Sequence, residues 1–263
     1  MLVIGEKINT SAKDVEKAVE KRDTSFIQDL ARRQVISGAD ALDVNVGTRI
    51  HAEVEDMKWA VKIIQKVVEV PLCIDSPNPL ALEAGLTQHK GKAIINSVTA
   101  EKKRVEGILP LLKRFHSKVI ALTMDEAGIP EDMRRRYTVA ERLVDLLTRE
   151  GIALDDIYID PLVRPISTDS GCGWTVLEAM RKIRGSFKGI HLICGLSNIS
   201  FGLPRRELLN RVFLSIAMPM GLDAVILDPL DKGMIPVIRA GEALLGKDEY
   251  CAKYLSSFRE GKL

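Results

Sequence analysis

Four short apolar segments of the sequence each lead into polar residues that could bind a ligand. They are Leu72-Cys73-Ile74-Asp75, Ala93-Ile94-Ile95-Asn96-Ser97, Ile157-Tyr158-Ile159-Asp160 and Leu192-Ile193-Cys194-Gly195-Leu196-Ser197-Asn198. A carboxylate can accept two hydrogen bonds from an amino-pyrimidinone edge, and each such charge-assisted bond contributes about 1.5 to 3 kcal/mol. Carboxamides can serve the mixed donors and acceptors of the same ring. These residue types therefore favour a planar heterocycle over a phosphate as the ligand.

The elements that would position these residues alternate along the chain. Strands are predicted at Leu2 to Ile4, Ala41 to Val44, Leu72 to Ile74, Ala93 to Ile95, Val119 to Leu122, Ile157 to Ile159, His191 to Ile193 and Ala224 to Leu227. Each is a nearly continuous apolar run, which is typical of strands buried on both faces of a parallel sheet.

Apolar residues recur at helical spacing between the predicted strands. The clearest patterns are Phe26 to Ala31 with Gly38 as a C-terminal cap, Met57 to Val68 stopped by Pro71, and Ala140 to Leu147 closed by Gly151. A fourth begins at Pro204 and carries Leu208, Leu209, Val212, Phe213 and Ile216 to Gly221. Eight strands that alternate with helices over 263 residues, with no linker, predict an α/β protein. We expect a single (β/α)8 barrel domain that spans residues 1–263.

Two segments of the sequence echo one another. Gly38-Ala39-Asp40-Ala41-Leu42-Asp43 and Gly221-Leu222-Asp223-Ala224-Val225-Ile226-Leu227-Asp228 both run from a helix-ending glycine through Asp-Ala into a strand that ends on Asp. The match is too short to prove a duplication. It predicts that both segments have the same structural role.

In a barrel, the polar residues that end the strands face the same rim, where barrel enzymes place their chemistry. In chain order these residues are Asn9, Asp43 with Asn45, Asp75, Asn96, Asp125, Asp160, Ser197 with Asn198, and Asp228. Any one of them could simply cap a helix or a turn, because Asp and Asn favour those positions. A set contributed by all eight strands favours a binding site.

Composition excludes several other classes of protein. The net charge is only +2, and no stretch interleaves basic and aromatic residues, so we expect no nucleic-acid partner. The longest apolar run, Val212 to Leu227, is broken by Pro219, Gly221 and Asp223, so we expect no membrane span. The four cysteines form no disulfide pattern, which predicts reduced thiols and a cytoplasmic location.

No metal site is predicted. His191 and Cys194 are three residues apart in a predicted strand segment, so their side chains would point to opposite faces. The basic runs Lys102-Lys103-Arg104 and Arg134-Arg135-Arg136 are interpreted as solvated helix faces, with steering of an anionic substrate tail as the alternative.

The motifs resemble the pterin-binding barrel family, and within it the methyltetrahydrofolate:corrinoid protein methyltransferases. The resemblance rests on Ile4-Gly5-Glu6-Lys7-Ile8-Asn9, Ala41-Leu42-Asp43-Val44-Asn45-Val46-Gly47, Ile74-Asp75-Ser76, Ile95-Asn96-Ser97, Tyr158-Ile159-Asp160-Pro161 and Gly195-Leu196-Ser197-Asn198. It covers essentially the whole chain. The motifs are specific as a set, although each one is short.

The resemblance implies roles for individual residues. Asp75, Asn96 and Asp160 would hydrogen-bond the pterin, with Asp43, Gly195 and Ser197 nearby, and with Asn9, Asn45, Arg206 and Asp228 as further possible site residues. Asn198 would be the catalytic residue, which reaches N5, the nitrogen that carries the methyl group. The substrate would be tetrahydrofolate or methyltetrahydrofolate. The chain lacks the Asp-x-His-x-x-Gly of corrinoid-carrying modules, so the corrinoid would belong to a separate partner protein, and a homodimer is expected by resemblance alone.

Two alternatives to this function stay open. Dihydropteroate synthase, a sister branch, places a lysine after strand seven and an Arg-x-His near strand eight, and neither Gly195 to Gly202 nor Ile226-Leu227-Asp228-Pro229 has them. A non-catalytic pterin-binding barrel is the other alternative. The segments Pro77-Asn78-Pro79 and Ser167 to Gly173 differ from the acetogenic pattern, which favours transfer from methylcobamide to tetrahydrofolate in a demethylase system.

Overall fold

All eight predicted strands are present in the computed structural model, which describes residues 1–263. The strands are β1 (Leu2–Asn9), β2 (Ala41–Asn45), β3 (Leu72–Asp75), β4 (Ile94–Thr99), β5 (Lys118–Leu122), β6 (Ile157–Asp160), β7 (His191–Leu192) and β8 (Ala224–Leu227). They form one parallel sheet in the order β7-β6-β5-β4-β3-β2-β1-β8. A parallel bridge between Gly195 and Ile226 links the two ends of this sheet. The predicted (β/α)8 barrel is confirmed.

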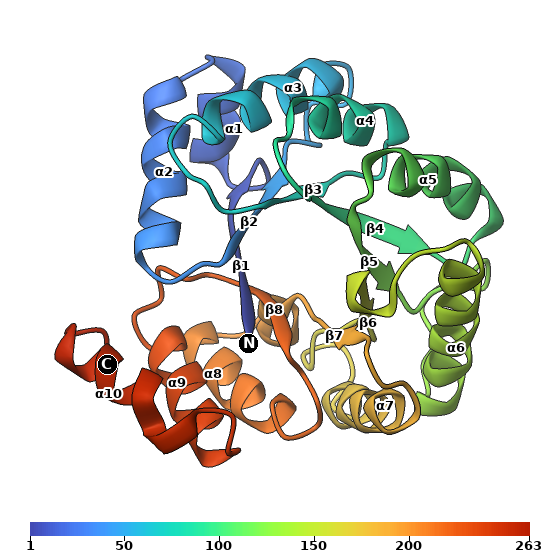
Figure 1. Ribbon diagram of the computed structural model, residues 1–263, viewed down its shortest axis with the longest axis vertical. Helices are drawn as coiled ribbons and strands as arrows, with labels where there is room; N and C mark the ends of the chain where they lie inside the picture. The colour runs from blue at the N-terminus through green and yellow to red at the C-terminus, as the bar shows by residue number, and fades with distance from the viewer.

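Helices surround the strands on the outside of the barrel (Figure 1). They are α1 (Lys13–Glu20), α2 (Thr24–Ile36), α3 (Glu53–Ile64), α4 (Pro79–Gln88), α5 (Lys102–Phe115), α6 (Met133–Arg149), α7 (Cys172–Ser186), α8 (Arg206–Ala217), α9 (Met234–Leu244) and α10 (Ala252–Arg259). None of them has the length and hydropathy that a membrane crossing requires.

Two apolar clusters stabilise the barrel. The larger one lies between the strands and the helix ring. The smaller one takes one residue from each strand or its immediate extension: Ile4, Ala41, Cys73, Ile94, Ile120, Tyr158, Ile193 and Ala224. Because these eight side chains contact one another, they fill the barrel interior, as barrel cores do. The interior is therefore a packed layer, and a ligand must bind at a rim.

Two helices differ from their predicted bounds. α3 ends at Ile64, so Val67 and Val68 lie in the turn that follows it and not in the helix. Three of the six residues from Gln65 to Val70 are valines, whose branched side chains disfavour helix. α8 begins at Arg206, because Arg205 adopts a left-handed conformation with φ of 49°, so Pro204 lies before the helix.

The echoed segments do have the same structural role. Gly38 and Gly221 both leave a helix at left-handed φ values of 106° and 107°. Asp40 then accepts a hydrogen bond from the backbone N–H of Val3 in β1 at 2.9 Å, and Asp223 accepts one from Leu192 in β7 at 2.8 Å. In both places an aspartate ties the start of a strand to the preceding strand of the sheet.

Candidate active site

Four of the predicted site residues form two hydrogen-bonded pairs at the carboxyl ends of β2, β3 and β4. The Asn45 amide donates to Asp75 at 2.8 Å, and the Asn96 amide donates to Asp43 at 3.2 Å. The register explains this proximity, because Asn45 lies opposite Asp75, and Asp75 lies opposite Asn96. The strand ends thus bring two carboxyl groups and two carboxamides together on one side of the rim.

Burial dominates the electrostatics of this group. The pKa of Asp43 is raised well above its usual value by burial and then by the neighbouring charge of Asp75, against the hydrogen bond from Asn96. Burial also raises the pKa of Asp75, against the hydrogen bond from Asn45. Two carboxyl groups that both resist ionisation hold protons more readily than exposed ones do. A protonated carboxyl can donate as well as accept, which widens the range of ring atoms it can bind.

Asp160 provides a third buried carboxyl group at the end of β6. Its side chain is only 7% exposed and accepts a hydrogen bond from the backbone N–H of Leu162 at 2.7 Å. Burial raises its pKa to about 7, although that hydrogen bond and the charge of Arg136 act in the opposite direction. This carboxyl group therefore changes protonation state near neutral pH.

The segment after β7 forms a tight turn at residues 196–200 that carries Asn198. The Ser197 hydroxyl donates to Glu6 at 2.7 Å, and Arg206 donates to the Ser197 carbonyl at 2.6 Å and to the Ser200 hydroxyl at 3.1 Å. The side chain of Asn198 is exposed and has no hydrogen-bond partner in the chain. The turn is thus held on both sides of Asn198, while the carboxamide itself is free to bind a ligand.

Glu6 belongs to this rim although sequence reasoning did not select it. The register of β1 against β2 shifts between Gly5 and Ile8, a bulge that lets β1 continue to Asn9. Bulges re-aim side chains next to functional sites. Burial raises the pKa of Glu6, against its hydrogen bond from Ser197. A charged residue inside a barrel strand was the available signal, and the short predicted strand, ending at Ile4, hid it.

Three other residues of the predicted ring accept hydrogen bonds in local turns. Asn9 accepts from the backbone N–H of Ser11 at 2.9 Å, Asp125 from Ala127 at 3.0 Å, and Asp228 from Leu230 at 2.9 Å. These are the turn-forming contacts that the capping alternative predicted. Asp228 is also 3.1 Å from Lys7 and adds its charge to the surroundings of Glu6, so it still lies at the rim of the site.

The interpretation of the basic runs as solvated faces is wrong for one arginine in each run. Lys102, Lys103, Arg134 and Arg135 are exposed as expected. Arg136 is only 1% exposed, and Arg104 is half-buried. Both guanidinium groups turn inward and donate to backbone carbonyls, because they lie in the first turn of a helix that passes beside the strand-end loops.

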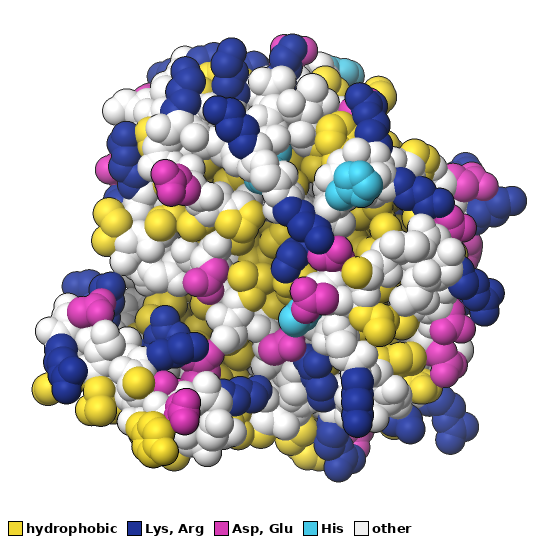
Figure 2. Space-filling view, in the orientation of Figure 1, with side chains coloured by type: hydrophobic (Ala, Val, Ile, Leu, Met, Phe, Trp, Pro, Cys, Tyr) yellow, Lys and Arg dark blue, Asp and Glu magenta, His cyan; other side chains and the backbone are white.

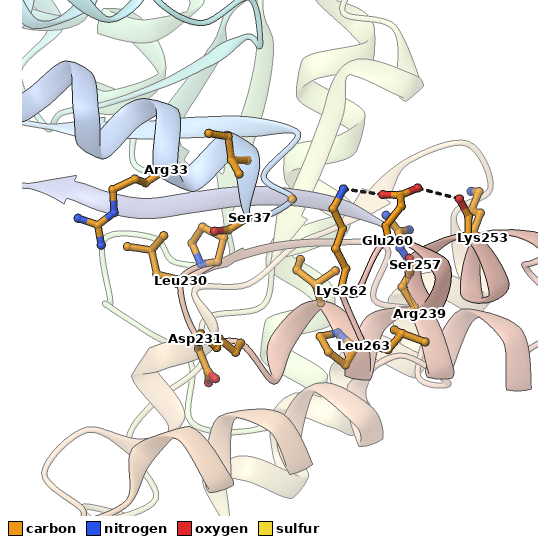
Figure 3. A pocket seen from close by; sticks show the side chains of 18 residues that line it. Arg33, Ser37, Leu230, Asp231, Arg239, Lys253, Ser257, Glu260, Lys262 and Leu263 are labelled. Atoms are coloured by element: carbon orange, nitrogen blue, oxygen red, sulfur yellow. Dashed lines mark hydrogen bonds and ion pairs between the residues drawn. The ribbon is translucent and has the colours of Figure 1, made fainter.

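A large groove elsewhere on the molecule is separate from this site. It has a volume of about 800 Å³ and lies between α2, the segment after β8 and the C-terminal residues (Figure 3). Lys262 and Glu260 pair there at 2.7 Å. None of the predicted site residues lines this groove. Size alone therefore does not locate the site.

A model of the family described as "Pterin binding enzyme" matches residues 5–228. The chain belongs to the pterin-binding enzyme family. The match runs from β1 to the residue that follows β8, so it includes every strand end described above. The resemblance read from the sequence motifs is confirmed.

Relatives of known activity narrow the class of pterin-binding enzyme. The chain is 38% identical over 265 aligned positions to the methylcorrinoid:tetrahydrofolate methyltransferase of Eubacterium limosum, covering 100% of this chain and 98% of that protein. It is 33% identical to part of the methionine synthase of Mycobacterium tuberculosis, covering 86% of this chain and 20% of that protein. This pterin-binding protein is an enzyme, a methyltransferase.

Solved structures of pterin-binding enzymes share the barrel. The dihydropteroate synthase of Xanthomonas albilineans in complex with 7,8-dihydropteroate superposes with a TM-score of 0.73 at 18% identity, over 93% of each chain. At that identity the likeness concerns the fold alone. It agrees with the single closed barrel and carries no statement about the reaction.

Proposed function

We propose that this methyltransferase moves a methyl group between a corrinoid protein and N5 of tetrahydrofolate. The observation that carries the proposal is the free carboxamide of Asn198 on a turn fixed by Glu6 and Arg206, at the same rim as the buried carboxyl groups. The E. limosum protein, which is similar over its whole length, is named for the same pair of substrates and supports this choice.

The ring-binding part of the site is assigned to the polar residues at the strand ends. Asp75, Asn96 and Asp160 bind the pterin edge, with Asp43, Gly195 and Ser197 around them. Carboxyl groups can accept hydrogen bonds from the amino group and the ring N–H of the pterin. Carboxamides can bind where the ring presents a donor beside an acceptor. Because Asp43 already pairs with Asn96, and Asn45 with Asp75, the free lone pairs are presented in fixed directions. Such preorganisation reduces the entropy lost on binding.

Asn198 is the residue assigned to N5. In the direction toward tetrahydrofolate, N5 attacks the methyl carbon, the cobalt–carbon bond breaks with its electron pair left on cobalt, and the N5 proton leaves to solvent. In reverse, N5 must gain a proton or a strong hydrogen bond as its bond to carbon breaks. A carboxamide can donate or accept by turning over, so one residue serves both directions. It cannot titrate, so its contribution is positional and electrostatic.

We propose the direction from methylated corrinoid to tetrahydrofolate, within a demethylase system. The name of the E. limosum relative, in which the methylcorrinoid comes before tetrahydrofolate, supports this direction. The two loops that differ from the acetogenic pattern, Pro77-Asn78-Pro79 and Ser167 to Gly173, lie after β3 and β6, at the rim that a corrinoid partner must approach. A dihydropteroate synthase activity is disfavoured because the turn after β7 has no lysine.

Absorbance of the corrinoid tests the reaction directly. The protein is mixed with tetrahydrofolate and methylcobalamin, and separately with methyltetrahydrofolate and reduced cobalamin. We expect the methylated and reduced corrinoid bands to interconvert in at least one mixture. If the corrinoid absorbance changes in neither mixture, even with a corrinoid protein supplied, the proposed function is refuted. Tight tetrahydrofolate binding without transfer would instead support the non-catalytic barrel.

We also propose a homodimer, with α8 in the interface. Leu208, Val212 and Ile216 recur at four-residue spacing and are 51%, 50% and 42% exposed, so the stripe predicted from sequence is only partly buried in the core. A second copy of the chain would cover these side chains. Sedimentation of the wild type and of Val212→Glu tests this. A monomeric wild type contradicts the assignment.

A further inference from the structure

The two inward-turned arginines of the basic runs lie directly behind the ring-binding residues. We propose that Arg104 and Arg136 are positioning residues that hold the loops after β3, β4 and β6 and so fix Asp75, Asn96 and Asp160 for binding. This inference rests on the proposed function, because it assigns the purpose of the arginines through the residues they support. In this role neither arginine needs to contact the ligand.

Arg136 supports the loop that follows Asp160. Its Nη1 donates to the carbonyls of Pro161 and Leu162, the latter at 2.6 Å, and its Nε donates to the carbonyl of Pro130 at 3.0 Å. Leu162 in turn donates its backbone N–H to the carboxyl group of Asp160. The Pro161 carbonyl and the Leu162 N–H belong to the same peptide unit, so Arg136 and Asp160 bind its opposite sides.

The backbone of this loop needs such support. Leu162 adopts φ of 63°, a left-handed conformation that costs energy in a residue with a branched side chain. The hydrogen bonds from Arg136 to the carbonyls of Pro161 and Leu162 stabilise this conformation. Without them, the N–H of Leu162 is no longer fixed toward Asp160.

Arg104 supports two neighbouring loops at once. Its Nε donates to the carbonyl of Ser97 at 2.8 Å, its Nη2 to that of Ser76 at 2.8 Å, and its Nη1 to that of Pro77. Ser76 directly follows Asp75, and Ser97 directly follows Asn96. The planar fork of the guanidinium thus ties the ends of β3 and β4 together.

The hydrogen-bond partners of the two arginines distinguish a positioning role from a solvated helix face and from steering of an anionic substrate tail. Burial raises the pKa values of Asp75 and Asp160, and the charges of Arg104 and Arg136 act against that rise, but neither guanidinium is hydrogen-bonded to a carboxylate, and Arg136 lies almost wholly out of solvent. A buried guanidinium is costly unless its donors are used, and here they are used on carbonyls. An arginine that steered an anionic substrate tail would instead keep its donors free and exposed.

Matched variants test Arg136. Arg136→Met removes the donors at similar volume, Arg136→Lys retains a charge but loses the fork, and Arg135→Met changes the exposed neighbour. We measure the dissociation constant for tetrahydrofolate by calorimetry, KM and kcat for methyl transfer from methylcobalamin, and the melting temperature. For Arg136→Met we expect the dissociation constant and KM to rise about tenfold or more, the factor that follows from losing one charge-assisted hydrogen bond, with a smaller fall in kcat. Arg136→Lys should lie in between, and Arg135→Met should match the wild type.

The outcomes distinguish positioning from bulk stability. A lowered melting temperature with an unchanged dissociation constant in Arg136→Met would show a purely structural role and overturn the assignment. Arg104→Met, with Lys103→Met as its control, is measured in parallel, so that the test stands even if Arg136→Met does not fold; unchanged affinity in Arg104→Met overturns the inference equally. A wild-type protein that does not bind tetrahydrofolate would instead refute the proposed function.

Discussion

The side-chain amide of Asn198 lies over Gly195, so that a β-carbon placed on Gly195 would be 3.0 Å from Nδ2 of Asn198. The backbone of Gly195 has φ of −74°, which any residue can adopt. A side chain at this position would therefore press on the carboxamide of Asn198, whereas the backbone conformation sets no limit. The absence of a side chain at Gly195 therefore allows the carboxamide of Asn198 to lie where it does.

Gly195→Ala should consequently displace Asn198 while leaving the fold intact. The added methyl group is closer to Nδ2 than most such contacts allow, and the exposed carboxamide can move away. We expect the rate of methyl transfer to fall by about tenfold or more, because misplacement of a reacting group by about 1 Å can cost up to 10²-fold. Gly185→Ala is the control, because nothing lies within 4 Å of that position. Equal rates for both alanine variants would show that the placement of Asn198 is not critical.

Asn198→Ala tests the catalytic role itself. We expect methyl transfer to fall by about 10²-fold or more, the scale seen when one preorganised hydrogen-bond donor is lost. Tetrahydrofolate binding should weaken less, because the ring-binding residues are untouched. Single-turnover rates and calorimetry measure the two quantities. Retention of the full rate would mean that Asn198 has been given the wrong role.

The fold was largely predictable from the sequence, because each strand is a short apolar run that needs both faces covered. The polar residues at the strand ends were also found, since Asp75, Asn96 and Asp160 stand at the ends of such runs. Glu6 was missed because a bulge in β1 cannot be read from residue types. Arg104 and Arg136 were misread because the direction of a side chain in a first helical turn depends on the loops packed beside it.

Asp160→Asn should change the pH dependence of stability. The pKa of Asp160 is raised to about 7 in the folded protein, against about 3.9 for an unfolded aspartate. The folded state therefore holds the proton more tightly, and the free energy of unfolding falls as the pH rises from about 4 to 7. Asparagine does not ionise and can still accept from Leu162. Above pH 7 we expect the variant to be more stable than the wild type, by up to about 4 kcal/mol.

Urea unfolding at pH 4.5 and pH 8 measures this difference. The wild type and Asp160→Asn should converge at the lower pH and separate at the higher one. A constant difference between them would show that Asp160 is ionised in the folded protein at both pH values.

His191→Gln tests a second group with a raised pKa, at the far end of the strands, whose contribution to stability is also lost as the pH rises. His191 lies 3.2 Å from Asp223 and 3.1 Å from Asp155. Acidic, basic and histidine side chains are interspersed over the face shown in Figure 2. The hydrogen bond to Asp223 is the main cause of its raised pKa, and burial opposes it. A histidine whose pKa is raised by folding stabilises the protein fully below about pH 6.5, the pKa of an unfolded histidine. This contribution is lost as the pH rises through the pKa of His191 in the folded protein.

The stability lost in His191→Gln should therefore be larger at pH 6 than at pH 9. Chemical unfolding of the variant and of His51→Gln, an exposed control, at both pH values measures it. A loss that is the same at both values would mean that the charge of His191 contributes nothing.

The short length of β7 has a consequence for how the protein opens. β7 has only two residues, and the barrel closes through the bridge at Gly195 and the hydrogen bond from the Ile226 N–H to the Cys194 carbonyl at 2.9 Å. Cys194 and Gly195 directly precede the turn at residues 196–200 that carries Asn198. We expect hydrogen exchange at Ile226 to be faster than at the centre of β2, and to slow when tetrahydrofolate binds. The hydrogen bond that closes the barrel and the turn that carries Asn198 would then open together. Substrate binding would thereby stabilise the closed barrel.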